Sequence, residues 1–176
     1  MTFPHLHCKP LVAATAFIAP NVTIVGDVSI GAGSSVWFGS VVRGDVQSIR
    51  IGCNTNIQDL VVVHVSTNGQ PTEVGDHVTV GHSAVLHSCK LHDFAFVGFG
   101  ARVLDTAEIE SDGLLAAGAI LTPGKIIRSK EMWAGNPAKF VRMLSDEAVE
   151  TNRRIAPRYA ELTSEYLALT LASTRA

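Results

Sequence analysis

Three of the seven histidines form the clearest pattern for chemistry in this sequence. His64, His82 and His87 lie close together in the chain, next to interruptions of a repeat. Imidazole is a common zinc ligand, and three protein ligands leave a fourth position open, as in catalytic zinc sites. The three histidines therefore indicate a metal site if the fold brings them together. The alternative is that they are exposed side chains at corners of the fold.

The element that must position them is a six-residue repeat. Large apolar residues recur at every sixth position in four registers, at Val12, Ile18, Ile24, Ile30, Val36, Val42, Ile51, Ile57, Val63, Val74, Val80, Leu86, Leu91, Val97, Val103, Ile109, Leu115, Leu121, Ile127 and Trp133. The residue two places earlier is often small or Val. This period does not keep one face of an α-helix. It predicts an all-β solenoid, a β-helix in which three hexads close one triangular coil.

The repeat is interrupted at three places in the middle of the chain. Three extra residues enter between Val42 and Ile51, and five enter between Val63 and Val74. One residue is missing between Leu86 and Leu91. Loops can vary without disturbing a regular scaffold, so we expect the functional residues at these interruptions.

Counting hexads predicts how the histidines lie. His64 follows Val63 and His87 follows Leu86, three hexads later, so both should stack on one face at a strand spacing of about 4.8 Å. Two such imidazoles can share a metal with bonds of about 2.0–2.1 Å. His82 lies on the preceding face and should point away from the pair. If it is a ligand, it belongs to a neighbouring molecule, and a trimer is the simplest closed arrangement.

The repeat stops after Gly135-Asn136-Pro137. Ser145 then offers an N-cap, followed by two acids at the positive end of a helix. Pro157 removes one backbone hydrogen bond and should bend or break that helix. We therefore expect a β-helix domain over residues 1–143 and a C-terminal helix over residues 144–176 that packs on it.

Composition narrows the class of protein. Charged residues make up 17% of the chain and the formal net charge is −2, which offers no basic surface for nucleic acid. No apolar run reaches the ~18 residues of a membrane span. Three widely spaced cysteines suit a reducing compartment. The segment from Met1 to Gly26 contains a single base, Lys9, and does not favour a secretory signal. We expect a cytoplasmic protein, with the mitochondrial matrix as the alternative.

Six segments resemble the γ-class carbonic anhydrases in order and spacing. They are Val42-Arg43-Gly44-Asp45, Asn56-Ile57-Gln58-Asp59, His64, Gly81 to Cys89, Gly135 to Lys139 and Leu144 to Glu147, and the similarity covers residues 18 to 166. The resemblance implies a trimeric left-handed parallel β-helix with a C-terminal α-helix. It also implies that His64 and His87 of one subunit and His82 of the next hold zinc, or iron or cobalt in some members.

The resemblance implies roles for six further residues. Gln58 matches the glutamine that hydrogen-bonds the metal-bound water, and Asn56 matches an asparagine that lines the site. Arg43, Asp45 and Asp59 match an ion-pair network at the subunit contact, and Tyr159 matches a tyrosine of the C-terminal helix near the site. The implied activity is zinc-dependent, reversible hydration of carbon dioxide to bicarbonate at subunit interfaces.

The sequence departs from the best-known active members at two positions. They carry a glutamate directly after the equivalent of Asp45 and another in the loop after the first histidine. Here the first position is Val46, and residues 65–72 contain no acid. Those glutamates are associated with proton transfer to buffer, so turnover is expected to be slow unless another group relays the proton.

Two other functions remain open. The segment from Trp133 to Phe140 resembles the mitochondrial branch of the family, whose members help to build respiratory complex I, as homotrimers or as heterotrimers with related chains. This chain is then a weak or inactive assembly subunit. The hexads alone are also shared with acyltransferases that use acetyl-coenzyme A.

Overall fold

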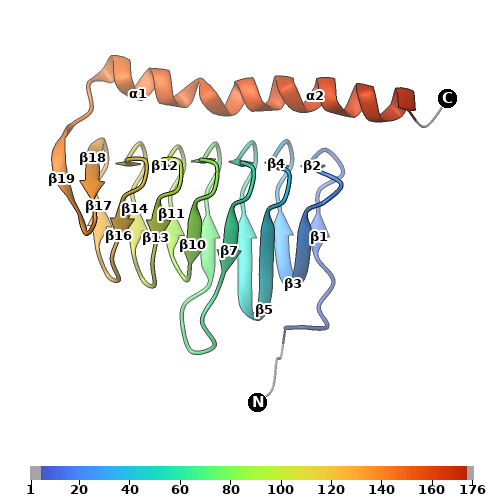
Figure 1. The fold of residues 1–176 in the computed structure, drawn as a ribbon, viewed down its shortest axis with the longest axis horizontal. Helices are drawn as coiled ribbons and strands as arrows, with labels where there is room; N and C mark the ends of the chain where they lie inside the picture. The colour runs from blue at the N-terminus through green and yellow to red at the C-terminus, as the bar shows by residue number, and fades with distance from the viewer. Residues whose placement is uncertain (1–4, 174–176) are drawn as a thin grey trace.

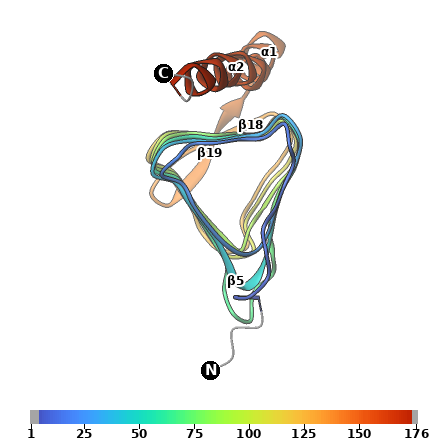
Figure 2. The ribbon, with the colours of Figure 1, turned by 90° about the vertical axis from the view of Figure 1, so that its right-hand side faces the viewer.

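The protein folds as a triangular prism of stacked coils, with a helical segment lying along one face (Figures 1 and 2). The computed structural model describes residues 5–173. The strands of an 11-stranded sheet are β1 Leu11–Val12, β3 Thr23–Ile30, β5 Val41–Ile51, β7 Val62–His64, β8 Thr72–Val74, β10 Val85–His87, β11 Lys90–Leu91, β13 Arg102–Val103, β14 Glu108–Ile109, β16 Ile120–Leu121 and β17 Ile126–Ile127. The strands of an 8-stranded sheet are β2 Phe17–Ile18, β4 Ser35–Val36, β6 Asn56–Ile57, β9 Thr79–Val80, β12 Phe96–Val97, β15 Leu114–Leu115, β18 Glu131–Gly135 and β19 Ala138–Met143.

Each short strand pairs in parallel with the strand one coil away, which places the repeat residues in columns. One column runs from Val42 to Val63, Leu86, Val103 and Leu121 through successive strand pairs. The column crosses all three sequence interruptions without losing register. The predicted fold, a left-handed parallel β-helix of hexapeptide repeats with a C-terminal helix, is confirmed.

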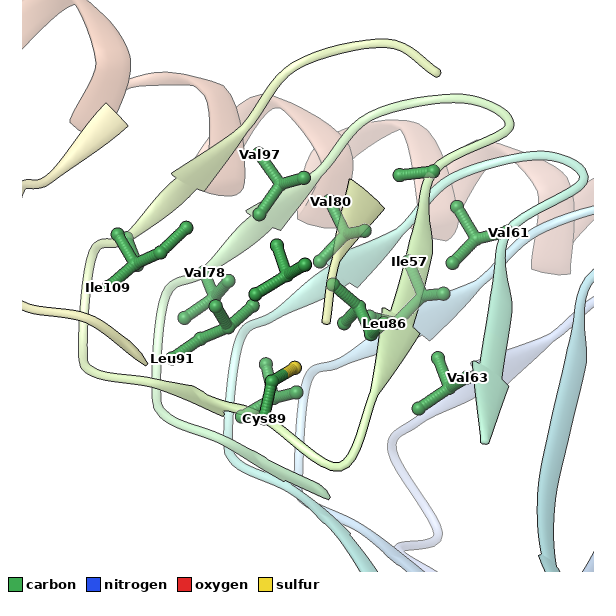
Figure 3. Close-up of a cluster of buried hydrophobic side chains, with 14 of the residues drawn as sticks. Ile57, Val61, Val63, Val78, Val80, Leu86, Cys89, Leu91, Val97 and Ile109 are labelled. Carbon is green, nitrogen blue, oxygen red and sulfur yellow. The ribbon is translucent and has the colours of Figure 1, made fainter. Parts of the chain in front are cut away.

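The repeat residues fill the interior of the prism (Figure 3). Leu86, Ile109 and Leu121 are fully buried, and so are the small residues two positions before such residues, for example Ala84 and Ala107. Burial of one Leu or Ile side chain contributes about 1.5–3 kcal/mol, so these columns are the main source of stability. The core is thus the part of the molecule that the hexads specify.

Val12 is the most exposed of the repeat residues, since 39% of its surface is accessible, whereas Ile18, Ile24 and Trp133 are partly buried. The first described strand, β1, pairs with β3 on one side only. The first repeat residue therefore has a neighbouring coil on one side and solvent on the other, which explains why it escapes burial.

The first interruption is built into strands and not into a loop. β5 spans 11 residues and lies beside the long strand β3, with a register shift between Gly26 and Val28. At this shift the two strands approach closely: a Cβ atom on Gly26, whose φ is +83°, would lie 2.1 Å from the Gly44 carbonyl oxygen. The second interruption leaves the prism as a loop between β7 and β8.

The chain leaves the β-helix through an antiparallel pair, β18 with β19, which the repeat pattern did not predict. Two helices follow, α1 at Asp146–Arg153 and α2 at Ile155–Ser173. Ser145 caps α1 as predicted, its hydroxyl accepting a hydrogen bond from the backbone N–H of Ala148. The predicted break is also present, because Arg154 separates the helices just before Pro157.

The helices lie along the face of the prism formed by the 8-stranded sheet (Figures 1 and 2). Trp37 packs edge-on against Tyr159 and Tyr166 of α2, with ring centroids 5.4 and 5.2 Å apart. At the other end, Arg153 of α1 forms two hydrogen bonds with the buried carboxylate of Asp112. Within residues 5–173, neither helix is both long and apolar enough to cross a membrane.

Candidate metal centre

His64 and His87 end two neighbouring strands and face each other. They are direct partners in the pairing of β7 with β10, so the predicted stacking one coil apart is confirmed. The Nδ1 atom of His64 lies 3.3 Å from the Nε2 atom of His87. Two bonds of about 2.0–2.1 Å at a tetrahedral metal span about 3.3–3.4 Å, so the two nitrogens already have the separation of a shared zinc ion.

The outer nitrogens of this pair are held by carboxylates. Nε2 of His64 lies 3.1 Å from Oδ1 of Asp45, and Nδ1 of His87 lies 2.6 Å from Oδ1 of Asp105. An ionised carboxylate can only accept hydrogen bonds, so the outer nitrogens carry the ring protons. In neutral rings the two inner nitrogens then present lone pairs to each other, an arrangement that a cation between them stabilises.

The electrostatics favour the neutral ring at His64 and ionised carboxylates beside the pair. Burial, the largest effect, lowers the pKa of His64 from its usual value, so the ring is neutral near pH 7. Burial acts to raise the pKa of Asp45, but hydrogen bonds from Arg43 and His64 outweigh it and lower that pKa. Burial likewise opposes hydrogen bonds from Ser66 and His87 at Asp105, and the net pKa is again lowered. Neutral imidazoles backed by ionised carboxylates are the form that binds metals.

His82 lies apart, in the turn after β9. Its Nδ1 atom is 2.7 Å from Oδ2 of Asp59, which leaves Nε2 available as a ligand. Its side chain is 41% exposed and packs against the ring of Phe99, with centroids 5.1 Å apart. Within residues 5–173, no three His, Cys, Asp or Glu side chains of one chain are grouped to hold a metal ion.

Gln58 and Asn56 lie on the same side of the molecule as His82. The Gln58 amide accepts a hydrogen bond from the backbone N–H of His82 at 3.2 Å and donates one to Oδ1 of Asn56 at 3.0 Å. Asn56 donates in turn to Thr79. Both amides are buried, so their orientation is fixed by the fold.

Tyr159 reaches the same region from α2. Together with Gln58, Phe99, Arg158 and Leu162 it lines a cleft of about 390 Å³ between the helix and the prism. Burial, and then the charge of Asp59, raise the pKa of the Tyr159 hydroxyl above its usual value. It is therefore a neutral hydrogen-bonding group near neutral pH.

The candidate residues thus form two half-sites. The histidine-pair half-site contains Arg43, Asp45, His64, His87 and Asp105, and the single-histidine half-site contains Asn56, Gln58, Asp59, His82 and Tyr159. Arg43 pairs with Asp45 at 2.5 Å within one chain, while Asp59 pairs with His82. Within one chain, therefore, Arg43, Asp45 and Asp59 do not form the single ion-pair network that was expected at the subunit contact.

Sequence reasoning missed Asp105 and Ser66. Asp105 lies 18 residues after His87, in the next coil but one residue beyond the position that corresponds to His87. Ser66 belongs to the loop after β7 and donates a 2.7 Å hydrogen bond to Asp105. The hexad count that paired the histidines leads from His87 to Leu104, because Leu86 pairs with Val103, and so it misses Asp105 by one residue. No comparable count leads to Ser66, because an inserted loop follows no period.

Known proteins with similar sequences bear on this geometry. The carbonic anhydrase of Geobacillus kaustophilus is 43% identical over 169 residues, which cover 96% of this chain and 92% of that protein. Gamma carbonic anhydrase 1 of Arabidopsis thaliana, named as mitochondrial, is 45% identical over 164 residues, or 90% of this chain and 60% of that protein. No protein-family model matches the chain.

The chain belongs to the γ-class carbonic anhydrase family.

A solved structure agrees with this membership. A hexapeptide transferase family protein from Anaplasma phagocytophilum has a TM-score of 0.86 and 49% identity, over 89% of this chain and 92% of that chain. This γ-class chain spans about three fifths of the length of the plant relatives that it matches.

The two departures from the best-known members of the family have clear structural settings. Val46 is part of the buried core, with 9% of its surface exposed, so this γ-class chain has an apolar contact where those members have a glutamate. The loop after β7 lacks an acid of its own but is joined through Ser66 to the carboxylate of Asp105.

Proposed function

We propose that this chain is a metal-dependent carbonic anhydrase that hydrates carbon dioxide to bicarbonate at sites shared between neighbouring subunits of a homotrimer. His64 and His87 of one subunit and His82 of the next are the metal ligands. Zinc is the proposed ion, with iron or cobalt as alternatives.

The observation that carries this proposal is the 3.3 Å separation of Nδ1 of His64 from Nε2 of His87. Each of the three histidines has one ring nitrogen on a carboxylate, Asp45, Asp59 or Asp105, and the other nitrogen available. Carboxylates that orient ligating imidazoles in this way are a regular feature of zinc sites.

Exposed apolar side chains next to both half-sites support sharing between subunits. Leu60 is 61% exposed directly after Asp59, and Phe99 is 57% exposed against His82. Val62, two residues before His64, is 39% exposed. A second subunit that covers these side chains would remove apolar surface from water and bring the available nitrogen of His82 to a histidine pair.

The chain's own residues have separable roles in this reaction. A zinc ion held by three imidazoles supplies Lewis acidity that makes water nucleophilic near neutral pH. Gln58 is fixed by its contacts with His82 and Asn56, and the remaining lone pair of its amide oxygen can orient the attacking water. Phe99 and Leu162 give the cleft apolar walls that suit carbon dioxide.

Arg43 is the residue most suited to link subunits. Its side chain is 45% exposed, and one of its two terminal nitrogens is bonded to Asp45 at 2.5 Å. The other N–H groups can reach Asp59 of a neighbouring subunit, which joins the two half-sites through charge as well as through metal. This role is structural, since Arg43 need not touch the substrate.

A second function has its own support. The similarity to mitochondrial relatives, together with Val46 and the acid-free loop, favours an assembly subunit of respiratory complex I in the mitochondrial matrix, with weak or no hydration activity. An acyltransferase is disfavoured, because the hexads that suggest it belong to the scaffold and explain none of the histidine contacts.

Metal content and hydration measured on the same sample test the proposal. We expect the purified protein to contain about one metal ion per chain, to lose hydration activity when a chelator removes it, and to regain activity with zinc, iron or cobalt. Activity that rises with buffer concentration would show that proton transfer limits turnover. Bound metal without hydration, and copurification with a respiratory membrane complex, would favour the second function. Absence of bound metal after reconstitution would contradict both the site and the activity.

A further inference from the structure

One carboxylate joins the inserted loop to the histidine pair. Asp105 lies just after β13, and its Oδ1 atom accepts a 2.6 Å hydrogen bond from Nδ1 of His87. Its Oδ2 atom accepts a 2.7 Å hydrogen bond from the hydroxyl of Ser66. Each oxygen of Asp105 therefore has one partner, and the carboxylate is fixed in rotation as well as in position.

The loop that carries Ser66 is itself anchored on the strand end of His87. The backbone N–H of Ser66 donates a 2.7 Å hydrogen bond to the hydroxyl of Ser88, and the amide of Gln70 donates to the Ser88 carbonyl at 3.1 Å. Ser88 is fully buried. The loop between β7 and β8 is thus built onto the residue next to His87 and holds Asp105 from the opposite side.

Asp105 differs from the carboxylate that orients His64. Asp45 divides its charge between His64 and the guanidinium of Arg43. Among the described residues, the ion-pair partner of Asp105 is His87. Its hydrogen bond to His87 is the shorter of the two carboxylate–histidine contacts in the pair. We therefore expect the orientation of His87 to depend more strongly on Asp105 than the orientation of His64 depends on Asp45.

We propose that Asp105 is a positioning residue of the metal centre: it locks His87 in the tautomer with its proton on Nδ1, so that Nε2 faces the metal, and Ser66 of the inserted loop holds Asp105 in place. This inference rests on the proposed function only in taking His87 as a metal ligand. It gives the five extra residues of the loop a purpose, because they bring a hydroxyl to the far side of the Asp105 carboxylate.

Two measurements on Asp105→Ala test the proposal. In the metal-free protein, ¹⁵N-resolved NMR of the imidazole rings should show the Nδ1–H tautomer for His87 in the wild type and a shift towards Nε2–H in the variant. Competition against a chelator of known affinity should show zinc binding weakened about 10–100-fold in the variant, the usual effect of losing an outer partner of a ligand. Ser66→Ala should weaken it by less.

Matched variants separate positioning from loss of structure. Asp93→Ala removes another corner carboxylate, which accepts a backbone hydrogen bond from Asp76 far from the histidine pair, and should leave zinc affinity and the His87 tautomer unchanged. Asp105→Asn keeps the size and the Ser66 contact while it removes the charge. It should weaken zinc binding about tenfold without changing the melting temperature of the metal-free protein, and it replaces the alanine variant if that variant does not fold.

The outcomes distinguish this inference from the proposed function. An Asp105 variant with wild-type zinc affinity and an unchanged His87 tautomer would overturn the positioning role and leave the metal centre intact. A wild type that binds no zinc would overturn the proposed function. The tautomer of His87 in the metal-free protein would then still decide whether Asp105 holds the ring.

Discussion

The middle coils, residues 41–91, and the later coils, residues 91–127, contribute to one continuous core but differ at their corners. In the later coils, paired strands are separated by three uninterrupted hexads, as in the pairing of Ile109 with Ile127. In the middle coils, Val63 pairs with Leu86 although the inserted loop lies between them. The inward column is equally buried in both regions. The comparison shows that the core tolerates insertions at the corners, where the polar residues collect.

The insertion also explains why two polar pairs have unequal spacing. Asp59 and His82 are further apart in the sequence than His87 and Asp105, yet each pair consists of neighbours in adjacent coils. The inserted loop increases the number of residues between two positions on either side of it, but these positions still lie in adjacent coils. Contacts in this fold therefore follow the coil count and not the residue count.

The largest expected effect comes from substituting a histidine that is a proposed metal ligand, compared with substituting one outside the site. His87→Ala should abolish zinc binding and hydration because it removes one of two facing nitrogens. His77→Ala, which removes a ring stacked on Phe94 at 4.9 Å, should leave both unchanged. Metal analysis and stopped-flow hydration of the folded variants check this. Equal loss in both variants would show that the middle coils hold no dedicated site.

A matched pair of core substitutions should separate stability from metal binding. Leu86→Ala and Leu121→Ala both truncate fully buried residues of one column and should each lower the free energy of unfolding by about 2–5 kcal/mol. Only Leu86→Ala should also weaken zinc binding, because Leu86 directly precedes His87. Denaturant melts and chelator competition measure the two effects. Equal weakening of zinc binding by Leu121→Ala would contradict the division between the two regions.

The smallest effect is expected at an exposed ion pair of the interrupted corner. A hydrogen bond from Arg50, the largest effect, lowers the pKa of Asp27 in the folded protein. The ionised form is thus favoured by folding, and its contribution is present above pH ~4 and lost as the pH falls through the lowered pKa. Asp27→Asn should cost less than about 1 kcal/mol at pH 7, because the pair is partly exposed.

Unfolding measured as a function of pH checks the Asp27 prediction. The difference between wild type and variant should vanish as the solution is acidified below pH ~4. A difference that persisted or grew in acid would show that Asp27 stabilises the corner through packing and not through charge.

The sequence was sufficient to predict the core and the histidine pair, because a fixed period converts residue numbers into positions. His64 and His87 were paired by counting hexads, whereas the same count leads from His87 to Leu104, one residue short of Asp105. The placement of Tyr159 against Trp37 could not be predicted in this way, since the repeat specifies nothing about how α2 lies across the prism. The antiparallel pair β18–β19 was not predicted for a related reason, because it begins where the repeat ends.

Mixed assembly of two inactive variants tests the shared centre most directly. His64→Ala lacks a member of the pair, and His82→Ala lacks the single histidine. If each site joins two subunits of a closed ring, dissociating and reassembling equal amounts should restore about one quarter of the wild-type zinc content and hydration activity. Recovery of neither would contradict a site built from two chains.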